Sequence, residues 1–287
     1  MSNIFKTTLL LTGMTLLLML AGRAFGGQSG MLMALAFATI LNFVSYFFSD
    51  KIALATYRAQ PVSREDLPRV YNIVERLAQK VSLPMPKVYL IPTDSPNAFA
   101  TGRNPNHASV AVTQGILGLL TDDELEGVLA HELGHVRNRD ILISSIAATL
   151  AGAITWLASI ARWGMIFGGM RGSRDDRDGG GIAAIAMMFL APFAAMLIQL
   201  AVSRSREYGA DDTGAHWTGN PYALASALAK IENYSHRLPL VASPSTAHLF
   251  IIAPFLGGMS FGSLFSTHPP TAKRIERLTG RPAEFGQ

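Results

Sequence analysis

The stretch VLAHELGHVRNRDILISS, residues 128–145, places His131 and His135 four positions apart, with Glu132 beside the first. At 3.6 residues per helical turn, these three side chains fall within an arc of about 100°. Two imidazoles at this spacing can bind one metal ion, and the carboxylate between them can reach a water molecule on that ion. The pattern is typical of zinc-assisted hydrolysis with Glu132 as the general base.

The residues around this motif favour a helix. Thr121 and Glu124 have the form of a capping box, acidic residues fill the first turn, and apolar residues then recur at helical spacing. We therefore expect one helix from residue 122 to about residue 140. An apolar segment begins at Ile141, so this helix should continue directly into it.

A site of this kind needs a third ligand. The chain has no cysteine, so a transition-metal site must use histidine and carboxylate groups. The longer motif H-E-x-x-H-x-x-G-x-x-H is absent, because Asn138 and Ile141 occupy the required glycine and histidine positions. The remaining possibility is a site of two histidines and one glutamate.

The expected third ligand is Glu207, the first glutamate after Glu132. Asp211 lies four residues beyond it on the same helical face. A carboxylate there can accept the second N–H of a zinc-bound histidine and fix its tautomer. The alternative for Glu207 is a surface charge paired with Arg204 or Arg206.

Long apolar segments indicate a membrane protein. Charged residues make up 15% of the 287, against about 25% in soluble domains. Residues 7–22 and 31–48 read together as a hairpin of two spans, with a signal peptide as the alternative for the first. Residues 141–161 and 182–202 contain no charge, and a buried helix pair in a soluble core is their alternative.

The positive charges near these segments predict their orientation. Lys51, Arg58 and Arg64 follow the second apolar run, whereas Arg23 stands alone in the turn before it. Both ends of the first hairpin should therefore be cytoplasmic. For the second hairpin, the positive charges argue against a full crossing, because four arginines lie in the loop 162–181 that would have to cross the membrane.

Other classes of protein fit the sequence less well. The small positive excess forms no basic patch, so nucleic-acid binding has no support. A channel or transporter normally carries some charge in its spans, and these spans carry none. A non-catalytic scaffold with structural zinc would usually use cysteine and would leave Glu132 without a role. The sequence does not indicate an oligomeric state.

Three motifs together resemble a known family. HELGH (131–135), SRSREYGAD (203–211) and STHPPTAKRIERL (266–278) are similar to the HtpX-type zinc membrane endopeptidases, a family shared with the CAAX prenyl endopeptidases. The resemblance covers nearly the whole chain. It implies a multi-pass protein of the bacterial inner membrane with a cytoplasmic catalytic domain, which degrades misfolded or damaged membrane proteins during stress. The alternative within the family is prenyl-protein processing.

The resemblance also implies roles for individual residues. The zinc ligands of the family, one ion per chain, match His131, His135 and Glu207, its catalytic base matches Glu132, and its partner of a ligand matches Asp211. A substrate-facing edge strand matches Asn97, Ala98 and Phe99. His268 and Arg274 match residues near the scissile carbonyl, where His268 would stabilise the oxyanion. The alternative for His268 is a turn residue that satisfies backbone groups near Pro269.

The expected fold is α+β: a mainly helical integral membrane protein with a gluzincin-like zinc peptidase domain and a small sheet. Strands are expected at 87–92, 97–102 and 108–113, and a helix at 64–82. The expected parts are an amino-terminal transmembrane hairpin (1–49), a first part of the peptidase domain with the HELGH helix (50–140), a second apolar hairpin with a flexible loop at 162–181 (141–202), and a second part of the peptidase domain with Glu207 (203–287). A hairpin returns the chain to one side, so the three ligands can meet.

Overall fold

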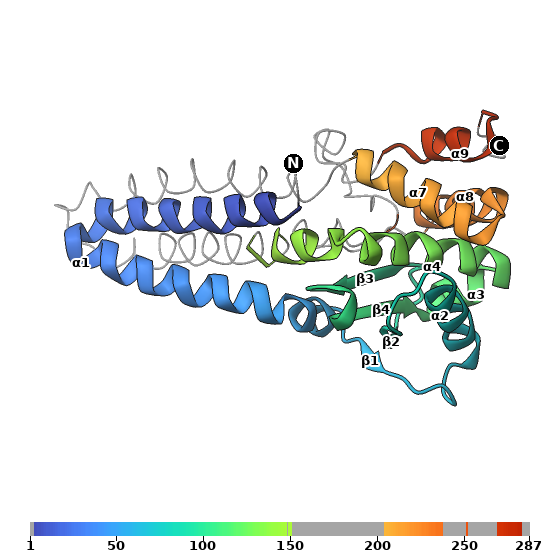
Figure 1. Cartoon of the computed structure of the whole chain (residues 1–287), viewed down its shortest axis with the longest axis horizontal. Helices are drawn as coiled ribbons and strands as arrows, with labels where there is room; N and C mark the ends of the chain where they lie inside the picture. The colour runs from blue at the N-terminus through green and yellow to red at the C-terminus, as the bar shows by residue number, and fades with distance from the viewer. Residues whose placement is uncertain (1–2, 148, 151–203, 238–250, 252–268, 283–287) are drawn as a thin grey trace.

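The amino-terminal apolar residues form helix α1, Asn3–Thr56, which is two helices joined at a sharp bend (Figure 1). The bend falls at Gly26 and Gly27, and Gly27 takes a φ of 58°, which glycine adopts at little cost. Beside the bend, a Cβ on Gly22 would lie 2.4 Å from the carbonyl oxygen of Gly30. Small residues therefore let the two helices approach closely, as in membrane helix pairs.

The surface of this hairpin suits a lipid environment. Within the part of the chain that the structure describes, Gly26–Thr56 is the one helix long and apolar enough to cross a membrane, and only 11% of its most apolar window is buried. The first helix has a shorter apolar segment, Phe5–Leu20. Between the two helices, Asn42 Nδ2 donates to Thr15 Oγ1 at 2.9 Å. The two expected apolar helices are present.

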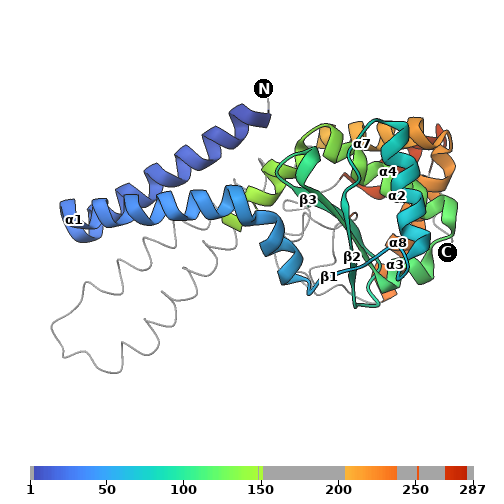
Figure 2. The same ribbon diagram turned by 60° about the horizontal axis from the view of Figure 1, so that its bottom comes forward.

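The computed structural model describes residues 3–147, 149–150, 204–237, 251 and 269–282. Most of the expected second hairpin, including the loop 162–181, lies outside these residues, as does nearly all of the apolar stretch 246–265. The part beyond α1 is an α+β unit, made of residues 60–137, 204–237 and 269–282. Figure 2 shows the hairpin leaving one end of this unit, with helix α2 toward the other end.

The sheet has four strands: β1 (Gln60–Pro61), β2 (Lys87–Ile91), β3 (Ala98–Gly102) and β4 (Ala108–Thr113). Their order is β1-β2-β4-β3, with β2 and β4 parallel and the other two pairs antiparallel. The three strands expected from the sequence are confirmed. β1 was not expected, because two residues carry no alternating pattern. β3 lies at the edge of the sheet, next to the helix that carries the motif.

The helices of the unit lie above the sheet and beside it (Figure 1). They are α2 (Pro68–Lys80), α3 (Gln114–Leu119), α4 (Asp122–Arg137), α7 (Arg204–Thr218), α8 (Pro221–Arg237) and α9 (Thr271–Thr279), with a short 3-10 helix η1 (Pro105–His107). α2 begins four residues later than expected, because Pro68 is favourable at the first helical position. α4 is central and packs against the sheet, α2, α7 and α8.

The motif helix ends earlier than expected, and this corrects the prediction of a continuous helix. α4 stops at Arg137, and Arg139 takes a φ of 58°. Asn138 N still donates to Gly134 O at 3.0 Å, and Arg139 N donates to Val136 O at 3.1 Å, which closes a tight terminal turn. Residues 140–147 are helical again, so α4 and the apolar segment are separate helices with a turn between them.

Candidate metal centre

The amino-terminal end of α4 is firmly anchored. Thr121 Oγ1 accepts from Glu124 N and the Glu124 side chain accepts from Thr121 N, which completes the expected capping box. The same Glu124 carboxylate accepts from Ser226 Oγ at 2.6 Å and Lys230 Nζ at 2.8 Å, both on α8. α4 therefore starts at a defined place and in a defined orientation against α8.

α7 crosses α4 at close range, which brings the third expected ligand to the histidines. A Cβ on Gly214 would lie 2.9 Å from the main-chain nitrogen of His131, closer than a side chain tolerates. Glycine at this position lets the two helix backbones meet, and Gly134 packs on Ala210 at ordinary contact distance. Glu207, two turns before Gly214 on α7, then faces the HELGH motif.

The structure brings the three expected ligands together. Glu207 Oε2 lies 3.7 Å from His131 Nε2, and Glu207 Oε1 lies 3.5 Å from His135 Nε2. One nitrogen or oxygen from each of the three residues can be chosen so that all lie within 4.8 Å of one another. Among the described residues this is the one group of histidine and carboxylate side chains with such a geometry. Two imidazoles and a carboxylate are the donor set of many catalytic zinc sites, so the residues suit a zinc ion.

A carboxylate lies beside the other nitrogen of each imidazole. Asp211 Oδ1 is 2.9 Å from His131 Nδ1, and Asp140 Oδ2 is 3.3 Å from His135 Nδ1. With Nδ1 facing a carboxylate, each ring presents Nε2 to the centre. The role expected for Asp211, as the partner of a ligand, stays a prediction, and Asp140 was not among the expected residues.

The turn after α4 explains why sequence reasoning missed Asp140. On a continuous helix, a residue five positions after His135 would point about 140° away from it. The turn at Asn138 and Arg139 swings Asp140 back toward the imidazole. Asn138 could have indicated that the helix ends there, because asparagine is frequent at helix ends.

The two histidines differ in electrostatic environment. Burial lowers the pKa of His131. Burial alone would also lower the pKa of His135, but the Glu207 carboxylate and the contact with Asp140 raise it to about 9. A proton must therefore leave His135 before its nitrogen can bind a metal near neutral pH.

Arg274 lies behind the centre and holds Asp211. Its Nε and Nη2 donate to the two oxygens of Asp211 at 2.8 and 2.7 Å, and its Nη1 donates to Ile251 O at 2.7 Å. The Arg274 side chain is fully buried. Burial alone would raise the pKa of Asp211, but the guanidinium holds it far below its ordinary value. The role near the scissile carbonyl expected for Arg274 stays a prediction, since these atoms contact the protein itself.

Glu132 lies on the sheet side of α4. Its Oε2 accepts from Ala100 N of β3 at 2.8 Å, which fixes the carboxylate next to the edge strand. Burial raises the pKa of Glu132 to about 7, with a smaller contribution from the negative charge of Glu207. A carboxyl group with such a pKa can both accept and return a proton near neutrality, as a general base must.

The edge strand presents alternate main-chain groups to the site. Thr113 N donates to Asn97 O at 3.0 Å, so the main chain of Asn97 faces β4. In an antiparallel ladder the direction alternates, hence Phe99 also faces β4 while Ala98 and Ala100 face the open edge. The hydrogen bond from Ala100 N to Glu132 confirms that the main chain of Ala100 points away from β4. Of the three residues expected to face substrate, Ala98 offers its main chain outward.

Asn97 and Phe99 have other contacts in the structure. The buried Asn97 side chain accepts from Ile251 N at 3.1 Å through Oδ1, which ties Ile251 to the residue that precedes β3. The Phe99 ring is buried against Tyr57, with ring centroids 5.6 Å apart. His268 lies outside the described residues. The substrate-binding roles of these residues stay predictions.

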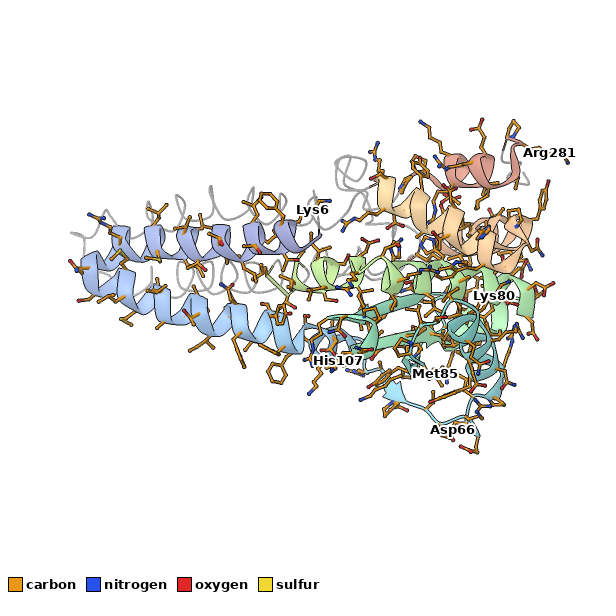
Figure 3. All side chains as sticks on the ribbon, in the orientation of Figure 1. Lys6, Asp66, Lys80, Met85, His107 and Arg281 are labelled. Atoms are coloured by element: carbon orange, nitrogen blue, oxygen red, sulfur yellow. The ribbon has the colours of Figure 1, made fainter. Side chains whose placement is uncertain are left out.

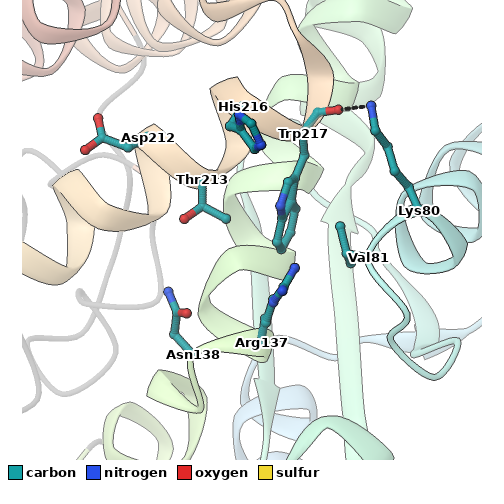
Figure 4. A pocket seen from close by; sticks show the side chains of 8 residues that line it. All are labelled: Lys80, Val81, Arg137, Asn138, Asp212, Thr213, His216 and Trp217. Atoms are coloured by element: carbon teal, nitrogen blue, oxygen red, sulfur yellow. Dashed lines mark hydrogen bonds between the residues drawn. The ribbon is translucent and has the colours of Figure 1, made fainter.

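A large cavity lies beside α4 and α7, away from the ligands. It measures about 570 Å³ and is lined by eight residues that Figure 4 labels, none of them an expected ligand. Lys80 Nζ donates to Trp217 O, and the Arg137 guanidinium lies 5.6 Å from the Trp217 ring centroid. These contacts join α2, α4 and α7 around Trp217.

The fold and the site define a class: metallopeptidases whose H-E-x-x-H helix meets a glutamate from a second helix, here attached to an apolar helical hairpin. Residues 64–282 match the model of peptidase family M48. A Syntrophobacter fumaroxidans relative named "Protease HtpX homolog" is 57% identical over 280 residues, which cover 97% of this chain and 99% of that one. A relative of the same name from Desulforapulum autotrophicum is 56% identical over 278 residues, covering 97% and 90% of the two chains.

A solved structure is similar in fold. The crystal structure of S. mikatae Ste24p superposes with a TM-score of 0.54 at 20% identity, and the match covers 96% of this chain and 65% of that longer one. The present chain belongs to peptidase family M48 and is a membrane metallopeptidase.

Proposed function

We propose that this chain is a zinc-dependent endopeptidase that hydrolyses misfolded or damaged membrane proteins, as part of membrane-protein quality control under stress. The observation that carries the proposal is the convergence of His131, His135 and Glu207, with the buried Glu132 carboxylate beside them. The relatives named as HtpX homologues cover nearly the whole chain at 56–57% identity, which favours this function over prenyl-protein processing.

Zinc is the proposed metal, with one ion per chain. The donor set of two imidazoles and one carboxylate supports it, and the carboxylates of Asp211 and Asp140 face Nδ1 of the two rings, which leaves Nε2 for the metal. When bound, zinc supplies Lewis-acid polarisation of the scissile carbonyl and lowers the pKa of the attacking water.

The residues of the chain handle the proton. Glu132 takes a proton from the attacking water at its carboxylate and later delivers it to the leaving amine. The hydrogen bond from Ala100 N orients that carboxylate, so the position of the base is fixed relative to the edge strand. His268, three residues before Thr271 at the start of helix α9, is the proposed donor to the developing oxyanion.

An extended substrate segment is proposed to lie along β3. The outward main-chain groups of Ala98 can bond to a peptide backbone, while Arg274 keeps the Asp211 side of the site rigid. Main-chain bonds do not depend on substrate side chains, which suits a protease of broad sequence preference.

The proposed location is the bacterial inner membrane, with the α+β unit in the cytoplasm. Lys51, Arg58 and Arg64 after the apolar run support this orientation. Because the native chain lacks cysteine, Ser63→Cys should react with a thiol reagent from the cytoplasmic side and Ser29→Cys from the opposite side. Labelling of Ser63→Cys from the outside would invert the topology.

The deciding experiment compares wild type with Glu132→Gln for metal content and for cleavage of an unfolded membrane protein. We expect the variant to keep one zinc per chain and to lose activity by about 10²–10⁴-fold, because the base is removed and the ligands are not. Glu207→Ala should instead lose the metal. Near-native cleavage by Glu132→Gln would exclude the proposed mechanism.

A further inference from the structure

A second cavity lies where the hairpin meets the α+β unit. Its lining residues belong to neither α4 nor α7, the two helices that carry the proposed metal ligands. It measures about 480 Å³. One wall is aromatic and comes from α1, with Phe43, Phe47 and Phe48. The other wall comes from the start of β2 and from the β3–β4 connection. Figure 3 shows His107 of that connection beside the end of α1.

The cavity coincides with the expected edge of the hydrocarbon core. The apolar run 31–48 is followed by Ser49 and then by Asp50 and Lys51, the first charged residues after Arg23. At 1.5 Å per residue that run is about 27 Å long, close to the roughly 30 Å of a bilayer core. Phe43 therefore lies on the lipid side of the boundary, and Lys51 lies at headgroup level.

Cations surround the polar end of the cavity. Lys51 Nζ is 5.1 Å from the centroid of the Phe48 ring, and the Arg103 guanidinium is 5.7 Å from that of Phe47. Lys87 lines the same cavity, and Asp50 is the one carboxylate residue among the lining residues described. Within the described part of the chain, Lys51, Lys87 and Arg103 form no ion pair with a carboxylate. Their charge is therefore available to an external anion.

The apolar side of the cavity is open to the surroundings. Phe43 is 57% exposed, Phe47 is 41% exposed, and Met85 on the opposite wall is 40% exposed. Exposed aromatic and thioether side chains at the end of a span are suited to contact with acyl chains. An apolar surface below a ring of cations matches a molecule with a hydrocarbon tail and an anionic head.

We propose that this cavity binds one anionic phospholipid of the surrounding bilayer. The phosphodiester lies among Lys51, Lys87 and Arg103, and an acyl chain runs along Phe43 and Phe47. Because Lys87 begins β2 and Arg103 follows β3, the bound lipid joins the sheet to the membrane surface and sets the tilt of the α+β unit. The inference does not depend on the peptidase function or on the side of the membrane that the unit faces.

The test measures lipid binding to the detergent-solubilised full chain by native mass spectrometry. Phosphatidylglycerol and phosphatidylcholine with identical acyl chains are titrated in parallel, and we expect preferential binding of phosphatidylglycerol. The double variant Lys87→Gln/Arg103→Gln should lose affinity for phosphatidylglycerol by roughly fivefold per removed cation, with little change for phosphatidylcholine.

The matched control is Lys273→Gln/Arg281→Gln, which removes the same charge from an exposed region at the far end of the unit (Figure 3). It should bind both lipids as wild type does. Equal binding of the two lipids by wild type, or an equal loss in the control, would overturn the proposal. Displacement of the lipid by glycerol phosphate at comparable concentration would overturn the lipid as occupant and leave a site for soluble phosphate. The unfolding midpoint of each variant checks its fold, and the single variants replace any double variant that fails to fold.

Discussion

Two arginine–aspartate pairs join α9 to α7, one in the interior and one at the surface. Arg274 contacts Asp211 at 2.7 Å in the interior, whereas Arg277 contacts Asp212 at 2.7 Å with both side chains about half exposed, at 52% and 50%. The partners are neighbours in the sequence and the chemistry is the same. The exposed pair contacts solvent, but the buried carboxylate also lies 2.9 Å from Nδ1 of His131, one of the proposed ligands.

The comparison shows that burial decides what an ion pair does. Two ions that lose their water must be satisfied by each other and by further hydrogen bonds, and removing one leaves a charge without compensation. An exposed pair competes with water and salt and contributes little. The buried pair therefore couples the metal centre to α9, while the exposed pair is dispensable.

The largest expected effect is on stability. Arg274→Met should lower the free energy of unfolding by about 3–5 kcal/mol, because Asp211 stays buried without its partner. Arg277→Met, the matched control, should unfold close to wild type. Denaturant titrations in detergent, followed by circular dichroism, measure both. Equal effects of the two variants would mean that burial does not distinguish the pairs.

A second effect is expected on the metal. Asp211→Asn should weaken zinc binding or activity by about 10–100-fold, since the amide no longer holds the His131 ring as a carboxylate does. Asp212→Asn, one residue away, should bind zinc as wild type does. Competition against a chromophoric chelator gives both affinities. A loss in Asp212→Asn as large as in Asp211→Asn would point to a general charge effect.

The pH dependence of metal binding tests the other histidine. The pKa of His135 in the metal-free protein is raised to about 9, and zinc needs the neutral ring, so binding must release this proton at any pH below 9. Zinc affinity should therefore rise with pH from 7 to 9, by up to about tenfold per pH unit. Asp140→Asn removes one of the charges that raise the pKa, so its dependence should be shallower. Calorimetry in buffers of different ionisation enthalpy counts the protons, and a pH-independent affinity would contradict the assignment.

The smallest effect concerns salt. At about 1 M salt the Debye length falls to roughly 3 Å, which screens exposed pairs far more than buried ones. The small difference between wild type and Arg277→Met should vanish between 0.05 and 1 M sodium chloride. The difference for Arg274→Met should persist. Thermal unfolding midpoints at the two salt concentrations provide the measurement, and a salt-sensitive Arg274 pair would show that solvent reaches it.

Local pattern made much of this protein predictable. The capping box and helical spacing located α4, short runs between turn-rich flanks located three strands, and the absence of cysteine limited the ligands to histidine and carboxylate groups. His131, Glu132 and His135 share one helical turn, so their proximity follows from the periodicity of a helix alone. Glu207 was inferred as the first glutamate after Glu132, and the fold brings it to the histidines.

What the tertiary structure decided lies where the chain changes direction or where distant segments meet. The turn at Arg139 brings Asp140 to His135, and α9 brings Arg274 to Asp211 across 63 positions of sequence. The register with β4 decides that the main chain of Asn97 faces β4 and that the main chain of Ala98 faces the open edge of the sheet. The sequence by itself determines which residues can do the chemistry, because local spacing sets helices and strands. Packing decides which charges are buried and therefore which of them act, since desolvation depends on everything that surrounds a group.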